Sequence, residues 1–600
     1  MDAPAYGYCG RALVIDASDG SKEVMPLPER VLRDYLGGVG LGTWLMRQLC
    51  PAGVDPLGAA APLAFVFSPL VGTPLTTSAK FAVVAKSPLT GLLNDALASS
   101  HFAISGKLTG YDAIVITGRA GTLTSILIDD GEVRLADARE LGGLSAGEAE
   151  EAVRERHGRR WRVAAIGRAG ENRVRYATLS HDGRHAGRGG LGAVLGAKNV
   201  KCVAVRGSTR VEPADRQAVL AAAKDLRQRS FGPATAKYRE LGTLANLLAF
   251  NAINTLPTRN FQAATFADAP ALSAEDLAAS RSIARDTCVS CSIGCEHIYA
   301  SSTGKKARVE YENVFALGPM CGVSDPDDVL EASARCDALG LDTISAGGTI
   351  AWAMECVERG LLDVPWLRFA DGRALLRVLD EIGDRTGIGA LLAEGSRRAA
   401  QRVGCGSEAF AAHVKGLEMP GYEPRTMQSM ALGLAVNARG ADHNRSGAYE
   451  ADLSGTLDRV HGSAEHVRAA IETEDRAAVM DSLILCKFLR GVFTEPFEEW
   501  ATLLAAVTGW GVTGTELRET ARRIVLAKRA YNIDQGWSAG DDWLPDRFLD
   551  EEVELASGRS AVLTRERLRS MIDIYYEERG LDPEGRPRAV PEREGTEPTP

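Results

Sequence analysis

The sequence lacks features that would place it in several common classes of protein. It has no stretch of about 18 uninterrupted apolar residues, and residues 1–10 carry no basic segment followed by an apolar run. Basic residues number 69 against 79 acidic residues, so the net charge is −10. This balance does not favour a surface that tracks phosphates. We therefore expect a cytoplasmic protein with no membrane span and no nucleic-acid partner.

A disulfide framework is not indicated either. The eleven cysteines are odd in number and scattered in spacing, which fits a reducing compartment. Most of them are interpreted as small buried hydrophobic residues or as bystanders without a role. These are Cys9, Cys50, Cys202, Cys321, Cys336, Cys356 and Cys405.

The remaining cysteines indicate a metal site. Cys288, Cys291 and Cys295 are separated by small residues and a glycine, so a tight loop can turn their sulfurs toward one centre. Cys486, alone in an apolar run, is the candidate for a fourth ligand. An iron–sulfur cluster is the preferred interpretation. Structural zinc is the alternative, although zinc sites favour paired C-x2-C hooks over C-x2-C-x3-C with a distant partner.

Length and patterning predict a multidomain α+β enzyme. The 600 residues are 45% hydrophobic and 25% charged, which is ordinary for a soluble enzyme with several cores. Short apolar runs between glycine-rich turns predict a β-rich domain over 1–211, including a hairpin over 125–135. Helical periodicity then predicts two mainly helical domains over 212–417 and 418–582, with a cofactor at the domain interface and a disordered tail over 583–600.

Two short patterns indicate a phosphate-bearing cofactor held in duplicate. Residues 187–192 match G-x-G-x-x-G, but the preceding strand ends too early for a dinucleotide site, so we expect the glycines, with Arg184, Arg188 and Lys198, to approach a phosphate or its magnesium. Residues 337–342 and 481–486 share the form D-x-L-x-L-[D/C]. The carboxylates of Asp337 and Asp481 could each accept two N–H bonds from a pterin. A chance repeat on two amphipathic helices is the alternative.

Taken together, these motifs resemble the tungsten-containing aldehyde:ferredoxin oxidoreductase family over nearly the whole chain. The similarity rests on the order and spacing of several segments. They are residues 35–42, 85–91, 169–172, 186–190 and 256–261, the three-cysteine loop, both D-x-L-x-L motifs and residues 575–580.

The resemblance implies a tungsten or molybdenum ion held by two pyranopterins, with one [4Fe-4S] cluster and a magnesium ion that bridges the pterin phosphates. The family's cluster ligands map onto Cys288, Cys291, Cys295 and Cys486. Cofactor contacts map onto Lys80, Leu97, Ala186, Arg188, Asp337, Leu341, Asp342, Arg445, Asp481, Leu485 and Lys487, with the Leu97 and Ala186 carbonyls on magnesium.

The catalytic positions of the family correspond to His443 and a glutamate, with Glu312 favoured over Glu310. The resemblance implies oxidation of an aldehyde, with electrons passed to ferredoxin or an iron–sulfur partner subunit. We expect a near-neutral imidazole to move protons. A low-potential reductase of an acyl-CoA or a carboxylic acid, within a larger complex, is the alternative. A zinc-stabilised binding protein is an alternative of another class, and both homo- and hetero-oligomers are compatible with the sequence.

Three departures from the family pattern stand out. Ile484 replaces the glycine of the second pterin motif, which we expect to be tolerated on a helix. Leu97 replaces an asparagine, which keeps a carbonyl and loses an amide. Residues 331–334 lack the histidine of a Glu-x-x-His motif, so we predict no metal that bridges a dimer.

Overall fold

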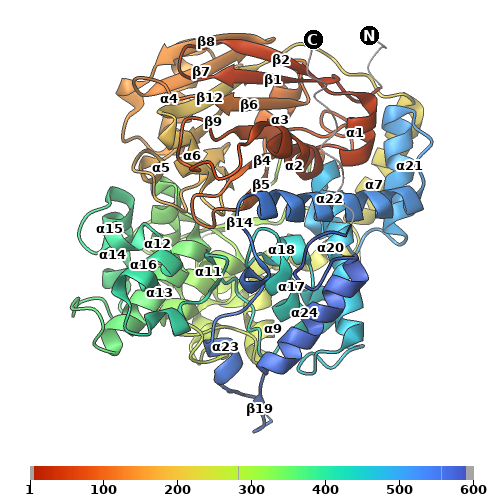
Figure 1. Cartoon of the computed structure of the whole chain (residues 1–600). Helices are drawn as coiled ribbons and strands as arrows, with labels where there is room; N and C mark the ends of the chain where they lie inside the picture. Colours follow the sequence, from red (N-terminus) through yellow and green to blue (C-terminus); the bar gives the residue numbers. More distant parts are fainter. Residues whose placement is uncertain (1–5, 282, 556, 589–600) are drawn as a thin grey trace.

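The computed structural model describes residues 6–281, 283–555 and 557–588. Figure 1 shows the β-rich N-terminal part at the top, the helices of the middle of the chain (green) at the lower left, and the C-terminal helices (blue) mainly on the right. Within the part of the chain that is described, no helix is both long enough and apolar enough to cross a membrane. The α+β architecture predicted from the sequence is confirmed.

The N-terminal part contains two six-stranded sheets. The first has the order β2-β1-β6-β3-β4-β5, and only its β1–β6 pair is parallel. Its strands are β1 (Arg11–Asp16), β2 (Lys22–Pro26), β3 (Leu63–Val66), β4 (Lys80–Lys86), β5 (Leu93–Ser99) and β6 (Ala113–Thr117). The second has the order β11-β10-β9-β12-β7-β8. Its strands are β7 (Thr124–Asp129), β8 (Glu132–Asp137), β9 (Arg162–Ile166), β10 (Leu179–His181), β11 (Arg184–Ala186) and β12 (Val200–Arg206).

Alternation along the strands explains how these sheets pack. Leu13, Ile15 and Phe65 of the first sheet share one buried cluster with Ile126 and Val203 of the second. The opposite face of the first sheet packs against α2, and α4 covers the second sheet. The N-terminal helices are α1 (Glu29–Tyr35), α2 (Gly38–Leu49), α3 (His101–Lys107), α4 (Ala146–His157), α5 (Arg168–Glu171) and α6 (Leu191–Ala197).

Helices dominate after residue 207, with one important exception. A three-stranded sheet of β13 (Ile283–Asp286), β14 (Glu296–Ala300) and β15 (Lys306–Val309) carries the three-cysteine loop. The helices are α7 (Arg216–Ser230), α8 (Pro233–Leu241), α9 (Asn246–Ala252), α10 (Ala274–Ser280), α11 (Tyr311–Leu317), α12 (Pro326–Leu339), α13 (Thr343–Glu358), α14 (Gly372–Asp384), α15 (Gly389–Leu392), α16 (Ser396–Val403), α17 (Gln428–Val436), α18 (His443–Ser446), α19 (Tyr449–Leu453), α20 (Ala464–Leu483), α21 (Pro496–Thr508), α22 (Gly514–Asp534), α23 (Arg547–Asp550) and α24 (Arg565–Arg579).

The structure bears on each of the expected boundaries. The one near residue 212 lies in the segment between β12 and α7. The one between 417 and 418 falls inside β17 (Leu417–Glu418), which pairs with β16 (His413–Val414). Glu418 also accepts hydrogen bonds from Ser396 and Thr349, which ties this hairpin to the preceding helices. The two helical parts share one apolar core rather than having separate ones.

The start of the expected disordered tail is different from the expectation. Residues 583–588 form a turn that pairs Leu581 with Pro587. Residues 589–600 of that tail lie outside the described residues. The turn packs against Trp537 and Tyr576, which leaves Gly585 no room for a side chain.

Candidate active site

A cavity of about 570 Å³ opens where the three parts of the chain meet. This volume lies in the range of ligand-binding pockets. The predicted site residues that line it are Lys80, Leu97, Arg188, Cys288, Cys295, Glu310, Glu312, Asp337, Leu341, Asp342, His443, Arg445, Asp481, Leu485, Cys486 and Lys487. Ala186 is buried in β11 between two lining residues, and Cys291 belongs to the same loop as Cys288.

The three-cysteine loop is closed by strand pairing. Asp286 of β13 pairs with Glu296 of β14, so the residues between them form the tip of a hairpin. A loop of the N-terminal part then ties this tip to Cys486. The Thr77 amide donates to the Ser290 carbonyl at 2.6 Å, and the Thr77 hydroxyl accepts from the Cys486 amide at 3.3 Å. Segments far apart in sequence are thereby joined.

The electrostatics of the sulfurs show that the four cysteines are neighbours. The pKa of Cys291 is raised to about 11, first by burial and then by the Cys486 and Cys288 sulfurs. Burial lowers the pKa of Lys80, but the Cys486 and Cys288 sulfurs outweigh it and the pKa is raised. Lys80 therefore lies beside these cysteines. A positive charge there would compensate thiolates bound to iron.

A single-ion site is not assembled among the residues that the structure describes: no three His, Cys, Asp or Glu side chains are grouped so that one ion could bind them. A structural zinc ion would need four such ligands at bonds of about 2.0–2.3 Å. A [4Fe-4S] cluster instead takes one thiolate at each iron, so its ligands stand farther apart. The loop and Cys486, joined through Thr77, provide the four thiols that such a cluster would take.

Both D-x-L-x-L motifs occupy the same kind of turn at the end of a helix. Asp337 lies in the last turn of α12, and Gly340 ends that helix with φ 77°. Asp481 lies in the last turn of α20, and Ile484 ends it with φ 65°. The expectation that Ile484 sits on a helix is therefore wrong. A β-branched residue in the left-handed region costs on the order of 1–3 kcal/mol, which the surrounding core must supply.

The glycine-rich segment over 36–42 positions the second motif. Gly38 opens α2 with φ 41°, and a Cβ there would lie 2.4 Å from the Asp481 carbonyl oxygen. Only a glycine allows the N-terminus of α2 to approach the end of α20 so closely. This segment therefore forms the entrance to α2.

Cations surround the second motif. Arg445 contacts Asp95 at 2.6 Å and Asp481 at 3.3 Å, and Lys487 contacts Asp481 at 3.0 Å. Asp95 is also paired with Lys528 at 3.1 Å. Because these charges are buried, the ion pairs hold the Asp481 carboxylate in one orientation toward the cavity.

The G-x-G-x-x-G segment over 187–192 allows close packing of the backbone and does not form a dinucleotide-binding unit. β10 and β11 form an antiparallel hairpin before it, so the strand–turn–helix unit of a dinucleotide site is not formed here. A Cβ on Gly190 would lie 2.1 Å from the Arg175 carbonyl oxygen. Lys198 is buried against the Ala59 and Gly118 carbonyls and does not reach the cavity, contrary to the expectation.

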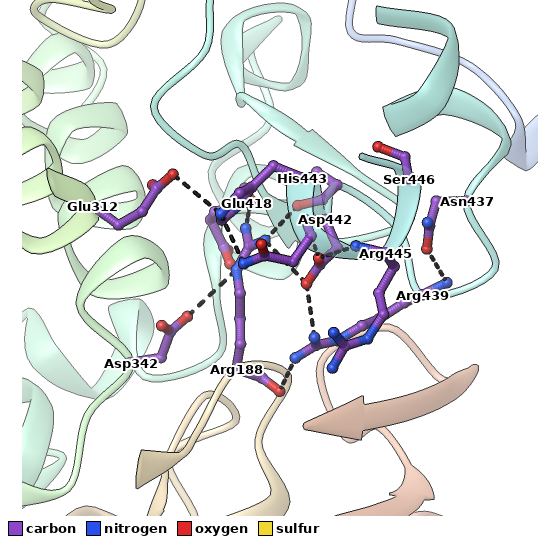
Figure 2. A network of polar contacts seen from close by, with 12 residues as sticks. Arg188, Glu312, Asp342, Glu418, Asn437, Arg439, Asp442, His443, Arg445 and Ser446 are labelled. Atoms are coloured by element: carbon purple, nitrogen blue, oxygen red, sulfur yellow. Dashed lines mark hydrogen bonds and ion pairs between the residues drawn. The ribbon is translucent and has the colours of Figure 1, made fainter. Parts of the chain in front are cut away.

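Arg188 extends from this turn into the centre of the site (Figure 2). It donates to the carbonyls of Ala441 and Glu418 and lies within 4 Å of the carboxylates of Asp342 and Asp442. Arg188 thus connects the N-terminal part to both helical parts at the cavity.

Glu312 and His443 lie opposite each other, with Glu312 Oε1 and His443 Nε2 3.6 Å apart (Figure 2). The Gly421 amide donates to the other Glu312 oxygen at 3.1 Å. Glu310, by contrast, accepts from the Thr243 hydroxyl and caps α11. The geometry supports Glu312 as the glutamate that faces the reaction site.

The pKa values of His443 and Glu312 differ from the expectation that the imidazole changes its protonation near neutral pH. Burial, reinforced by Arg188, lowers the pKa of His443 to about 3 even though Asp442 opposes the shift. The imidazole is therefore neutral at physiological pH, contrary to the expectation of a near-neutral pKa. Burial raises the pKa of Glu312 to about 7. Glu312 is the group whose protonation changes near neutrality.

Several buried atoms of cavity-lining residues lack a hydrogen-bond partner among the described residues. They include Arg188 Nε, Glu312 Oε1, His443 Nδ1 and Asp481 Oδ2. Buried polar groups are normally satisfied, so their convergence indicates a polar ligand. Donors from arginine and acceptors from aspartate fit a pterin that bears amino and phosphate groups.

Several lining residues had no distinct signal in the sequence. His185 hydrogen-bonds with Ser180 at 2.6 Å and lies 3.2 Å from Asp337. Arg439 contacts Asp442 at 2.7 Å and donates to the Asn94 side chain. His185 could have been found from its place directly before the glycine turn, and Asp442 from its place directly before His443.

Two family models match the chain. The model described as "Aldehyde ferredoxin oxidoreductase, N-terminal domain" matches residues 12–207, and "Aldehyde ferredoxin oxidoreductase, domains 2 & 3" matches residues 220–592. A β-rich base, two helical parts and a cavity lined by thiols and carboxylates are features of a cofactor-dependent oxidoreductase. The chain belongs to the aldehyde ferredoxin oxidoreductase family.

Curated relatives extend over the whole length. The tungsten-containing aldehyde ferredoxin oxidoreductase of Pyrococcus furiosus is 35% identical to this chain, and the match covers 97% of each protein. The tungsten-containing aldehyde ferredoxin oxidoreductase of Thermococcus kodakarensis is also 35% identical, and the match covers 98% of this chain and 99% of that protein. The WOR-like subunit of an aliphatic sulfonate oxidoreductase of Pyrococcus furiosus is 29% identical over 97% of this chain and 96% of its own. The active-site complex BamBC of benzoyl coenzyme A reductase has the same fold, with a TM-score of 0.83, 24% identity and coverage of 97% of this chain and 96% of that one.

Proposed function

We propose that this chain oxidises an aldehyde with water to a carboxylic acid, releasing two electrons and two protons per turnover. The observation that carries the proposal is the Glu312–His443 pair, which faces a cavity lined by both aspartate motifs and by three of the four candidate cysteines. The curated relatives at 35% identity are named as tungsten-containing aldehyde ferredoxin oxidoreductases, which supports the same reaction.

The residues fit a bis-pyranopterin centre. Asp337 and Asp342 would hold one pterin, and Asp481, with Arg445 and Lys487, would hold the other. The Leu97 and Ala186 carbonyls would hold a magnesium ion between the phosphates. A tungsten or molybdenum ion bound there supplies Lewis acidity and accepts two electrons.

The chain's own groups then bind the substrate and move protons. Neutral His443 can donate a hydrogen bond from one ring nitrogen to the substrate oxygen. Glu312, with a pKa raised to about 7 by burial, can accept a proton from water or the hydrate and release it again. The burial of both groups restricts water at this point, which strengthens their hydrogen bonds to the substrate.

Cys288, Cys291, Cys295 and Cys486 would hold a [4Fe-4S] cluster, which would supply one-electron transfer. The acceptor would be a ferredoxin or an iron–sulfur partner subunit. Leu485 of the second D-x-L-x-L motif directly precedes Cys486, so a pterin and a cluster held by these residues would lie close together.

An anaerobic assay with a viologen dye tests this function directly. Aldehyde should reduce the oxidised dye, and the Glu312→Gln variant with the same metal content should not. Reduction of an acyl-CoA or a carboxylic acid by the reduced dye, without any aldehyde oxidation, would support the low-potential reductase instead.

A further inference from the structure

The part of the cavity beside Glu312 and His443 is walled by aromatic rings. Four of these side chains line the cavity and come from α9, α11, α19 and the loop before α17. We call them the aromatic chamber: Phe250, Tyr311, Tyr422 and Tyr449. His443 lies in van der Waals reach of this group, with its ring centroid 5.3 Å from Tyr422 and 6.2 Å from Tyr449.

The rings support one another in defined orientations. Tyr422 stacks on Tyr449 with centroids 5.1 Å apart, and Phe250 meets Tyr311 edge-on at 5.1 Å. Phe250 also lies 5.4 Å from Tyr422. These spacings are those of favourable aromatic pairs, so the walls are held rigidly before any substrate binds.

The chamber offers few free polar groups to a substrate. The Tyr311 hydroxyl donates to the Gly421 carbonyl. The Arg490 guanidinium lies 5.1 Å from the Tyr449 ring centroid and is paired with Glu450 at 2.8 Å.

One solvent-exposed edge of the cavity lies beside the chamber. Leu453, 43% exposed, lines the cavity one helical turn beyond Tyr449, and the exposed Lys237 lines it as well. Because Tyr422 and Tyr449 are the neighbours of the His443 ring, a substrate that enters at this edge with its carbonyl toward His443 brings its substituent alongside them.

We infer that the aromatic chamber binds the ring of an aromatic aldehyde, so that this enzyme prefers aryl over alkyl aldehydes of similar size. This inference rests on the proposed function. A planar ring gains stacked and edge-to-face contacts with Tyr422, Tyr449 and Phe250 that a saturated ring of equal size cannot make.

The test compares benzaldehyde with cyclohexanecarbaldehyde in the holoenzyme and in two variants. Tyr449→Leu removes a ring while keeping an apolar side chain, and Tyr449→Phe is the matched control that keeps the ring. The measured quantity is kcat/KM for benzaldehyde divided by kcat/KM for cyclohexanecarbaldehyde. Comparing this ratio between a variant and the wild type removes the difference in intrinsic reactivity of the two aldehydes. We expect Tyr449→Leu to lower this ratio roughly 2- to 10-fold, and Tyr449→Phe to leave it within about twofold.

A binding measurement provides a readout independent of turnover. Benzamide and cyclohexanecarboxamide do not react, so calorimetry can compare how an aromatic and a saturated ring bind. Benzamide should bind more tightly to the wild type and to Tyr449→Phe than to Tyr449→Leu. Tungsten and iron content, measured in every preparation, shows whether a variant is assembled.

The outcomes separate the inference from the proposed function. If wild type oxidises both aldehydes and Tyr449→Leu leaves their ratio and the benzamide affinity unchanged, the chamber does not select aromatic substrates while the proposed function stands. If loaded wild type oxidises no aldehyde, the proposed function is wrong and the inference is overturned with it.

Discussion

Replacing Glu312 by glutamine should stabilise the folded protein, and by more at pH 8 than at pH 5. Burial raises the pKa of this carboxyl from an ordinary value of 4.5 to about 7. Between these two values the unfolded chain releases the proton while the folded chain retains it. The folded state is therefore penalised increasingly as the pH rises, and the penalty is complete above pH 7.

The size of the effect follows from the two pKa values. Each pH unit between them costs about 1.4 kcal/mol, so the penalty is under about 1 kcal/mol at pH 5 and about 3 kcal/mol at pH 8. Glutamine carries no charge, and its amide oxygen can still accept from the Gly421 amide. For 600 residues an entropy of unfolding of about 2.1 cal/mol/K per residue converts the difference into roughly 2 °C of melting temperature.

Thermal melting of wild type and Glu312→Gln at both pH values, at matched metal content, measures this effect. Glu310→Gln is the matched control, because Glu310 accepts from Thr243 and caps α11, so its replacement should not raise the melting temperature. A melting difference between Glu312→Gln and wild type that is the same at pH 5 and pH 8 would refute the reasoning.

Two further predictions concern the cavity and its support. His443→Ala should lower kcat by at least about 10²-fold, because a positioned hydrogen-bonding group is lost. The tungsten and iron content should stay unchanged. Loss of the metal would instead identify His443 as a structural residue. Gly38→Ala places a Cβ 2.4 Å from the Asp481 carbonyl oxygen, so it should lower both the melting temperature and the tungsten content. Gly147→Ala is the control, because Gly147 is exposed and no atom lies within 4 Å of the added Cβ; it should lower neither quantity. Equal behaviour of the two variants would contradict the close-approach argument.

Local signals in the sequence predicted much of the fold. Apolar runs such as residues 63–67 and 113–116 became buried strands, and the periodic segments over 464–484 and 564–578 became α20 and α24. Each signal is contained within one element, so it can be interpreted without knowing its neighbours. The hairpin around the cysteine loop was not anticipated, because β13 is short and exposed and carries no alternation of apolar residues.

Properties that depend on distant segments were the ones misjudged. The pKa of His443 is set by burial and by Arg188, which is 255 positions away in the chain as numbered. The left-handed conformation of Ile484 depends on how α20 ends against α2. The aromatic chamber joins rings from four separate segments, so no local pattern marks it.

The most direct test of the central claim is the metal content and spectrum of anaerobically purified protein from cells supplied with tungsten and molybdenum. The account predicts about one tungsten or molybdenum and four iron atoms per chain, with a brown absorbance that Cys486→Ser reduces together with the iron. Wild-type protein that is fully folded and colourless, and carries zinc in place of iron and either heavier metal, would contradict it.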